Sequence, residues 1–587
     1  MKEIRQIIHA FEAARDQQKK AALATVVHIE GSSYRGPGAR MLIMEDGTLT
    51  GAISGGCLEG DTLRKAMRVM MEEKPLLVTY DTSDEDDPVL GIGLGCNGII
   101  RILIEPISSR NETTAISLLQ RTLEKRQPSV LVTYFALDDK KHAEQGTKIL
   151  VNADGVITAD THLPIPYQQI DPDIRRILAG KGSAFVQYPS GGQEGSTITA
   201  FIEYMEPALS LVIAGAGNDV LPLAQLAELL GWDLTLVDGR PSYANQVRFP
   251  NCQVIVSDPL HGLRQVAIDE RTAVVLMSHN YDYDKAILSQ VINSPASYIG
   301  MLGPKRKRDQ MFRELTDDGL IIAEAQQLKL YGPTGLAIGA ETPEEIALSI
   351  IAEIKAVFAG KKGEHLRDQT GGIHQRQTKI VPSLQAYGIL ILAAGQSKRL
   401  GKPKQQLVYK GNTLLQHAVK AAAMVGTAAT VVVLGAQAEV LMKELDGTNV
   451  DCIQNEDYQE GMASSIRKGI QYLTGKYPKI ENILVMLCDQ PYVDTAHLIA
   501  LINKQQSTGA SITASYYAGR KGVPALFHQS VFSQLLELRG DIGAKQVIEQ
   551  MGDEVAVVPF PLGAVDIDTK EAYHQTMELD IPKYTAP

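Results

Sequence analysis

Apolar runs of strand length recur along this chain, and small, basic or acidic residues follow most of them. Residues 388–392 and 483–488 are almost wholly apolar, which is typical of central strands in a parallel sheet. Residues 209–214 and 232–238 form a second pair of strands around a helix-length segment, which indicates a β–α–β unit. The first 15 residues place apolar side chains among charges, which predicts an amphipathic helix.

Changes in this pattern divide the chain into four parts. Residues 1–206 contain short β runs between glycine turns and are predicted to form an N-terminal α+β region. Residues 207–358 are predicted to be a Rossmann-like domain, and residues 386–587 a second α/β domain. Residues 359–385 are polar, are marked by glycine and carry almost no buriable periodicity, so we expect a linker. The predicted fold class is multidomain α/β.

Charge and cysteine content exclude several functional classes. The net charge is −11 over 587 residues, and the pI is near 5.6. Nucleic-acid binding needs a broad basic surface, so a nucleic-acid partner is not expected. The five cysteines are far apart, which indicates no disulfide framework and suits a reducing cytoplasm. No apolar run reaches bilayer-spanning length, so we expect a soluble protein without a membrane partner.

The strand at 388–392 leads into a loop suited to a nucleoside triphosphate. Ala393, Ala394 and Gly395 leave backbone N–H groups accessible to phosphate. Arg399, Lys402 and Lys404 then supply positive charge for a departing pyrophosphate. The loop lacks P-loop spacing, so we expect attack on the α-phosphate rather than γ-phosphate hydrolysis. A solvated basic loop is the alternative.

Acidic residues follow two other apolar segments. Asp489 ends the strand at 483–488 and is predicted to hold Mg²⁺ against the triphosphate, because ligands bind beyond the carboxyl ends of parallel strands. Its alternative role is a helix N-cap. Asp566 and Asp568 alternate along an extended segment and so face one side, where one of them could complete the metal shell.

Residues 386–587 resemble the MobA-like nucleotidyltransferase family and, more narrowly, its molybdenum cofactor cytidylyltransferases. The motifs are Leu392-Ala-Ala-Gly-x-Ser-x-Arg399-Leu-Gly-x-Pro-Lys404-Gln, Asn455, Gly461-Met-Ala-Ser-Ser465, Cys488-Asp-Gln-Pro491, Gly522-Val-Pro-Ala-Leu-Phe527, Arg539-Gly-Asp-x-Gly-Ala544 and Asp566-Ile-Asp-Thr569. The resemblance implies a Rossmann-like GT-A-type fold that transfers CMP from CTP to molybdenum-bound molybdopterin, giving molybdopterin cytosine dinucleotide and pyrophosphate. Ala394 and Pro403 stand where guanylyl-transferring relatives usually carry glycine and an acid.

The resemblance also assigns roles to residues. The catalytic residues are Arg399, Lys404 and Asp489. The nucleotide would contact Leu392, Ala393, Ala394, Gly395, Arg399, Lys404, Asn455 and Asp489. Gly461 and Ser465 would contact the cofactor, and Asp489, Asp566 and Asp568 the metal. The alternative is a nucleotidyltransferase for another acceptor, such as a sugar or polyol phosphate.

The Rossmann-like segment carries a damaged dinucleotide fingerprint. Gly215 and Gly217 follow a strand, and Asp238 ends the next strand about 20 residues later. Val220 replaces the expected small residue, and Asp219 brings negative charge to the place of a pyrophosphate. We therefore expect Asp219 to cap the following helix, with Asp238 and Arg240 as candidate ligand contacts. An NAD(P)-linked oxidoreductase centred on residues 207–358 remains the alternative.

The N-terminal region combines glycine turns with cations and two cysteines. Gly31, Arg35 and Arg40 suit an anionic cofactor, because turn amides and guanidinium groups both bind anions. Cys57 and Cys96 lie in glycine-rich turns, where thiolates would be accessible to molybdenum or to sulfur. The alternative is that both cysteines are small buried hydrophobes.

Residues 1–358 resemble the XdhC/CoxI family through these glycine-rich runs, Tyr298-Ile-Gly-Met-Leu-Gly-Pro-Lys-Arg-Lys307 and Pro333-Thr-Gly-Leu-Ala-Ile-Gly-Ala-Glu-Thr-Pro-Glu-Glu-Ile346. The resemblance implies a molybdenum cofactor chaperone that delivers the cofactor to a molybdenum hydroxylase such as xanthine dehydrogenase. A cysteine desulfurase and further copies of this chain are its other implied partners. Its cofactor-binding residues would be Gly31, Arg35, Arg40, Cys57, Cys96, Gly215, Gly217 and Asp238.

Overall fold

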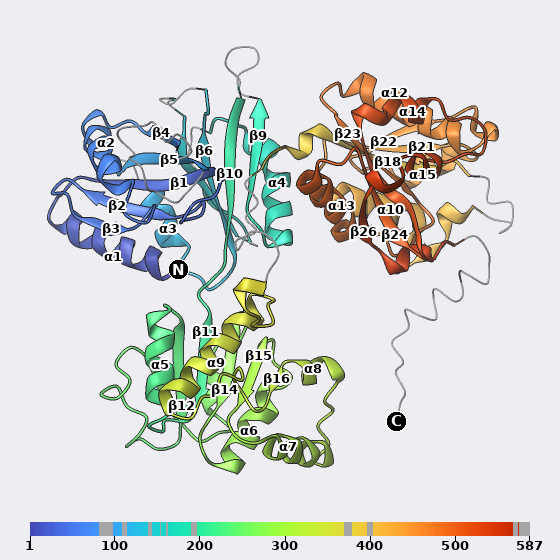
Figure 1. Cartoon of the computed structure of the whole chain (residues 1–587). Coiled ribbons are helices and arrows are strands. Elements are labelled where there is room, and N and C mark those ends of the chain that lie inside the picture. The colour runs from blue at the N-terminus through green and yellow to red at the C-terminus, as the bar shows by residue number, and fades with distance from the viewer. Residues whose placement is uncertain are drawn as a thin grey trace.

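The computed structural model arranges the chain as three lobes (Figure 1). It describes residues 1–81, 98–107, 114–138, 142, 144–152, 154–159, 163–189, 197–368, 379–395, 403–567 and 573. Four predicted site residues, Cys96, Arg399, Lys402 and Asp568, lie outside this part of the chain. The structure confirms the predicted multidomain α/β class, since each lobe is built on its own sheet or pair of sheets. Among the helices of the described residues, none combines the length and apolarity that a membrane crossing needs.

The first lobe contains two sheets with helices packed against them. One has the order β3-β2-β1-β5-β4 and the other β17-β9-β10-β6-β7-β8. The predicted amphipathic helix is α1, which buries Ile4, Ile7 and Ile8. The elements are α1 (Lys2–Asp16), β1 (Ala21–Gly31), β2 (Arg40–Met44), β3 (Leu49–Gly51), α2 (Glu59–Glu72), β4 (Leu76–Asp81), β5 (Gly98–Ile107), α3 (Ala115–Arg121), β6 (Ser129–Phe135), β7 (Gly146–Asn152), β8 (Gly155–Ala159), α4 (Tyr167–Gly180), β9 (Ala184–Pro189) and β10 (Thr197–Met205).

The second lobe is an open parallel sheet of order β13-β12-β11-β14-β15-β16. The chain turns back between β11 and β14, so the order reverses there and a crevice forms at the carboxyl ends of these strands. The elements are β11 (Ser210–Ala214), α5 (Val220–Leu229), β12 (Asp233–Asp238), β13 (Gln253–Val256), η1 (Gly262–Gln265), β14 (Thr272–Leu276), α6 (Tyr281–Val291), β15 (Tyr298–Met301), α7 (Lys305–Asp317), α8 (Glu324–Leu328), β16 (Leu330–Tyr331) and α9 (Pro343–Phe358).

The third lobe is a mixed sheet of order β22-β21-β18-β23-β25-β24-β26. The two predicted apolar strands are β18 and β23, which pair in parallel with Leu392 opposite Leu487. The loops after both strands therefore open at one edge of the sheet. The elements are β18 (Tyr387–Ala393), η4 (Lys404–Gln406), β19 (Val408–Tyr409), β20 (Asn412–Thr413), α10 (Leu414–Ala423), β21 (Ala429–Leu434), α11 (Ala438–Glu444), β22 (Asp451–Gln454), η5 (Tyr458–Glu460), α12 (Met462–Lys476), β23 (Asn482–Leu487), α13 (Thr495–Thr508), β24 (Ile512–Tyr517), β25 (Arg520–His528), η6 (Gln529–Val531), α14 (Phe532–Leu536), α15 (Lys545–Gln550), η7 (Gly552–Glu554), β26 (Ala556–Pro559) and η8 (Pro561–Ala564).

The segment predicted as a linker contains ordered structure at both ends of its described parts. Residues 366–368 form η2 (Leu366–Asp368), and residues 384–386 form η3 (Leu384–Ala386). Between them, β17 (Ile380–Pro382) pairs in parallel with β9 and so extends a sheet of the first lobe. The transferase-side strand β18 follows almost at once. The chain therefore enters the third lobe from a fixed position on the first.

A buried polar network holds these two lobes together. The Arg176 guanidinium on α4 donates to Asn503 at 2.9 Å and to Gln506 at 2.8 Å, both on α13. The same guanidinium pairs with Asp173, which is fully buried and also accepts from the Tyr188 hydroxyl at 2.8 Å. Because these groups are desolvated and mutually bonded, they fix the position of α4 on α13.

Candidate functional site

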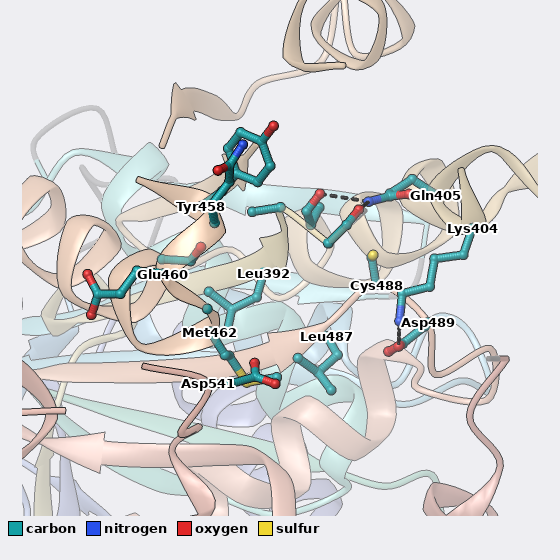
Figure 2. Close-up of a pocket in the computed structure, with 16 residues that line it drawn as sticks. Leu392, Lys404, Gln405, Tyr458, Glu460, Met462, Leu487, Cys488, Asp489 and Asp541 are labelled. Atoms are coloured by element: carbon teal, nitrogen blue, oxygen red, sulfur yellow. Dashed lines mark hydrogen bonds and ion pairs between the residues drawn. The ribbon is translucent and has the colours of Figure 1, made fainter. Parts of the chain in front are cut away.

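A cavity of about 740 Å³ opens at the carboxyl edge of the third sheet (Figure 2). Its walls come from the ends of β18 and β23, the η4 turn, the start of α12 and Asp541. It brings together eight of the predicted site residues: Leu392, Ala393, Ala394, Gly395, Lys404, Gly461, Ser465 and Asp489. Its size is that of a small-molecule site.

Lys404 and Asp489 face each other on one side of this cavity. The Lys404 ammonium contacts carboxylate oxygen Oδ2 of Asp489. Asp489 is only 6 % exposed, and its other oxygen, Oδ1, is buried with no hydrogen-bond partner in the described structure. A buried carboxylate oxygen without a donor is the kind of group that a bound cation satisfies.

The loop after β18 is held from behind by a glutamine. Gln405 is buried, and its amide donates to the carbonyl oxygens of Ala393 at 2.8 Å and Gly395 at 3.0 Å. These bonds fix the loop backbone whose N–H groups are candidates for phosphate binding. The sequence motif contained Gln405 without assigning it a role; its position directly after Lys404 was the available signal.

The opposite wall is formed by the entry into α12. Gly461 has φ 120°, and a Cβ at this position would lie 2.6 Å from the backbone of Asp541. The side chain of Asn455 donates to Ser464 at 2.8 Å and to Ser465 at 3.0 Å. Asn455 itself is not among the residues lining the cavity, so its predicted contact with nucleotide is replaced here by support of the α12 entry.

Glu460 braces this wall from the outside. Its carboxylate accepts from Arg467 at 2.7 Å and from the backbone N–H of Gly540 at 3.2 Å. The hydrogen bond from Arg467 is the main cause that lowers the pKa of Glu460 to about 2. Glu460 and Asp541 both line the cavity, and sequence reasoning assigned neither of them a role.

The predicted metal ligands converge only in part. The backbone N–H of Ile567 donates to the carbonyl of Asp489 at 3.1 Å, which brings Asp566 beside Asp489. Burial raises the pKa of Tyr517, and the charges of Asp566 and Asp489 raise it further. Carboxylate oxygens are hard ligands of the kind Mg²⁺ prefers. Within the described residues, no three His, Cys, Asp or Glu side chains gather around one point, and Asp568 lies outside them.

One further cavity residue, Cys488, is a buried thiol. Desolvation raises its pKa to about 12, and the neighbouring Asp489 charge adds to this shift. The thiol is therefore protonated at neutral pH and shapes the cavity as a small apolar side chain.

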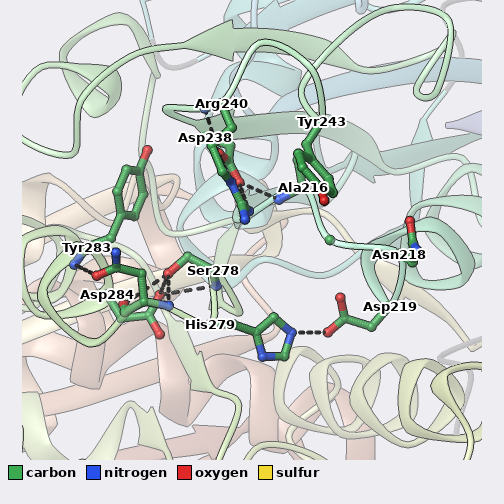
Figure 3. A network of polar contacts seen from close by, with 12 residues as sticks. Ala216, Asn218, Asp219, Asp238, Arg240, Tyr243, Ser278, His279, Tyr283 and Asp284 are labelled. Atoms are coloured by element: carbon green, nitrogen blue, oxygen red, sulfur yellow. Dashed lines mark hydrogen bonds and ion pairs between the residues drawn. The ribbon is translucent and has the colours of Figure 1, made fainter.

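The Rossmann-like lobe fills its own ribose position (Figure 3). Both oxygens of Asp238 are engaged, Oδ1 by the backbone N–H of Arg240 at 2.8 Å and Oδ2 by the Arg240 side chain at 2.6 Å. Oδ2 also accepts from the backbone N–H of Ala216 at 2.8 Å. Gly215 has φ 129° and abuts the Met277 carbonyl, so its glycine serves close backbone packing.

The expected cap at the start of α5 is wrong. Asp219 makes no side-chain cap hydrogen bond. Its Oδ2 instead lies 2.8 Å from His279 Nε2, across the crevice between β11 and β14. A Cβ on Gly217 would lie 2.3 Å from the other Asp219 oxygen, so Gly217 gives room to this pair. The ion pair with histidine competes successfully with the local cap.

The N-terminal candidates are distributed over different environments. Arg35 pairs with Glu3 at 2.5 Å, and Arg40, which is 2 % exposed, pairs with Glu203. Both predicted cofactor-binding cations therefore already have carboxylate partners. Gly31 ends β1 with φ 78°. Cys57 is exposed, as a reactive thiol requires, with its sulfur 3.4 Å from the Ser54 hydroxyl.

Comparison with known families identifies three regions. Residues 14–81 match the XdhC and CoxI family, residues 211–354 match the XdhC Rossmann domain, and residues 389–555 match the MobA-like NTP transferase domain. Both resemblances inferred from the sequence motifs are thereby confirmed.

Individual relatives agree with this division. A probable xanthine dehydrogenase component of Bacillus subtilis is 32% identical over 353 residues, covering 59% of this chain and 95% of the relative. The Escherichia coli molybdenum cofactor insertion chaperone PaoD is 24% identical over 339 residues, covering 58% and 84%. A probable molybdenum cofactor guanylyltransferase of Bacillus cereus is 21% identical over 207 residues, covering 33% and 98%. The chain therefore belongs to the XdhC and CoxI family and carries a MobA-like NTP transferase domain after its XdhC Rossmann domain.

Proposed function

We propose that this protein matures the molybdenum cofactor in two steps. The third lobe transfers CMP from CTP to molybdenum-bound molybdopterin, giving molybdopterin cytosine dinucleotide and pyrophosphate. The first two lobes bind the cofactor and deliver it to a molybdenum hydroxylase, with a cysteine desulfurase as the source of any terminal sulfur. The observation that carries the transferase step is the Lys404–Asp489 pair beside the Gln405-supported loop in one cavity.

The cavity residues suit in-line nucleotidyl transfer. An oxygen of the cofactor's terminal phosphate attacks the α-phosphorus of CTP, and the bond from that phosphorus to the β-phosphate oxygen breaks as pyrophosphate leaves. No covalent bond to the protein forms. Backbone N–H groups around Gly395 would bind the triphosphate, and the Lys404 ammonium would neutralise charge on the leaving group.

Asp489 and Asp566 would hold Mg²⁺ in this proposal. The partnerless Oδ1 of Asp489 is aligned with this role, because a carboxylate oxygen buried without a donor gains most from a cation. Bound there, Mg²⁺ would screen the charge of the triphosphate. The choice of CTP is supported by Ala394 and Pro403, which replace the glycine and the acid usual in guanylyl-transferring relatives.

The transferase step is tested by pyrophosphate release. Purified protein is incubated with Mg²⁺, molybdenum-loaded molybdopterin and CTP, GTP or ATP, and the dinucleotide is identified by mass. We expect a cytosine dinucleotide and little product with GTP or ATP. Asp489→Asn is the control for the site, and it should abolish release. A product with a sugar or polyol phosphate, and none with molybdopterin, would show that the acceptor is different.

The delivery step needs a separate readout. Apo-xanthine dehydrogenase is mixed with cofactor-loaded protein, and the recovery of hydroxylase activity is followed. Cys57→Ser should slow recovery if its exposed thiol handles molybdenum or sulfur. Cys452→Ser, in the third lobe, is the matched control. Equal recovery with both variants would reduce the first lobes to a binding scaffold with an inert Cys57.

A further inference from the structure

A second large cleft lies between the first lobe and the Rossmann-like lobe. Its volume is about 510 Å³, and the start of α1 lies at its mouth. Figure 1 marks this end of the chain between the two lobes. On the Rossmann side it is bounded by Leu209, Trp232 and Arg271, which precede β11, β12 and β14. The cleft therefore faces the amino ends of these strands, away from the glycine-bearing edge.

The lining of this cleft is positively charged although the chain has net charge −11. Three acids line it, Glu3, Glu203 and Glu206, against five bases, Lys2, Arg35, Arg40, Arg271 and Lys355. An excess of cations in a low-dielectric cleft attracts anions. The sequence had singled out Arg35 and Arg40, and the cleft is the place where the fold collects them.

The three acids are occupied by three of the arginines. Glu3 pairs with Arg35, Glu203 with Arg40, and Glu206 with Arg271 at 2.8 Å. The two lysines supply the excess. Lys2 donates to the carbonyl oxygen of Leu229 at 2.7 Å. Exposed Lys355 makes no ion pair within the described part of the chain. Both ammonium charges are thus without a neutralising carboxylate.

Arg271 adds an unused donor and an aromatic neighbour. Its Nε is buried and has no hydrogen-bond partner in the described structure. Its guanidinium lies over the ring of Phe358, 5.5 Å from the centroid, and Trp232 forms another part of the lining. Buried donors are normally satisfied, so a spare N–H beside aromatic side chains favours an anion that carries a planar ring.

The cleft is held open by contacts between the lobes. The guanidinium of Arg126 donates to Asp269 at 2.8 Å and to Asp233 at 3.0 Å, and it also reaches the carbonyl of Ala208. Arg5 reaches Asp233 as well, at 2.7 Å. A site fixed in this way costs little ordering when a ligand binds.

We infer that this cleft binds a small molecule that carries a phosphate or diphosphate group and a planar ring. The proposed transferase product is of this class, and only in identifying the ligand with that product does the inference rest on the proposed function. Its phosphate groups would be neutralised by Lys2 and Lys355, and Arg271 would donate its spare N–H.

Trp232 offers a local reporter because it is the only tryptophan in the chain. Its fluorescence is followed while the full-length protein is titrated with inorganic pyrophosphate or with cytidine diphosphate. Sulfate at matched ionic strength is the reference. We expect a saturable change with both probes and tighter binding of cytidine diphosphate. Lys355→Glu should weaken binding about tenfold or more.

Lys361→Glu is the matched control, because Lys361 is exposed just beyond the same helix and does not line the cleft. It should bind both probes like the unmodified protein. No Trp232 response to either probe, an equal response to sulfate, or equal weakening by both charge reversals would each overturn the inference. Lys355→Glu should retain pyrophosphate release at the third lobe, so failure here and failure of the transferase proposal are distinguishable.

Discussion

The Lys404 ammonium contacts the Asp489 carboxylate across 85 residues of sequence. The two residues follow different parallel strands, and the pairing of β18 with β23 brings their loops to the same edge. In a cavity that is partly desolvated, an isolated carboxylate or ammonium would be costly, so each group stabilises the other. The pair keeps a cation next to the oxygen that the proposed Mg²⁺ would use and keeps the lysine within reach of the phosphates.

Replacing Lys404 by alanine should lower turnover about 10²- to 10³-fold, because one positive charge at the leaving group is lost. Lys443→Ala is the matched control, since Lys443 is exposed on α11 and does not line the cavity. Initial rates of pyrophosphate release give the comparison. The fold should persist, because water can reach Asp489 from the open cavity, and a melting curve checks this. Near-normal turnover would remove Lys404 from the mechanism.

The local pattern of the sequence predicted the strands and loops but not the partners of charged side chains. The apolar runs identified β18 and β23, and the small residues after β18 indicated the cavity, since both features depend on nearby residues. Asp219 was expected to cap α5, whereas His279, 60 residues away, takes its carboxylate. The engagement of Asp238 by Arg240 likewise depends on the turn that the chain makes after β12.

The joint between the lobes was the least predictable feature. The polar composition of residues 359–385 indicated a linker, yet β17 adds to the first lobe through backbone hydrogen bonds, which carry little sequence signature. Gln405 illustrates the same difficulty on a smaller scale, because its role is to bond the backbone of residues 10 and 12 positions earlier.

Substitution of Gly461 by alanine should destabilise the third lobe by about 2 kcal/mol or more, since the backbone has φ 120° and a methyl group would meet Asp541. Gly475→Ala, farther along α12, is the control. A Cβ there meets nothing within 4 Å, so a gain of about 0.5–1 kcal/mol is expected from helix propensity. Urea unfolding of both variants provides the measurement, and equal effects would contradict the proposed close approach at Gly461.

Loss of Arg176 should loosen the joint between the first and third lobes. Its side chain is 3% exposed, and Arg176→Ala leaves the fully buried Asp173 without its cationic partner, at a cost of about 3–5 kcal/mol. The adjacent Arg175 is a matched control, because it pairs with Asp171 while 74% exposed and should contribute less than about 1 kcal/mol. Limited proteolysis near β17 should accelerate only in Arg176→Ala. Equal proteolysis of both variants would show that the network does not hold the lobes.

The acid sensitivity of the third lobe should depend on His497. This side chain is 8% exposed, stacks on Phe560 with ring centroids 3.9 Å apart, and lies 2.7 Å from the Ser515 hydroxyl. Burial lowers its pKa from 6.5 to about 4. Because the folded pKa lies below the unfolded one, the neutral form stabilises the fold. That contribution is fully present above pH 6.5 and is lost as the pH falls toward 4, by about 3 kcal/mol in total.

His497→Gln removes this titration while keeping a polar group that can reach Ser515. Between about pH 7 and about pH 5, its melting temperature should therefore fall less than that of the unmodified protein. His365→Gln is the control, since His365 is exposed and lies before β17. It should retain the full pH dependence. If His497→Gln and the unmodified protein lose stability in parallel over this range, the acid sensitivity arises from other groups, and His497 does not titrate on unfolding as proposed.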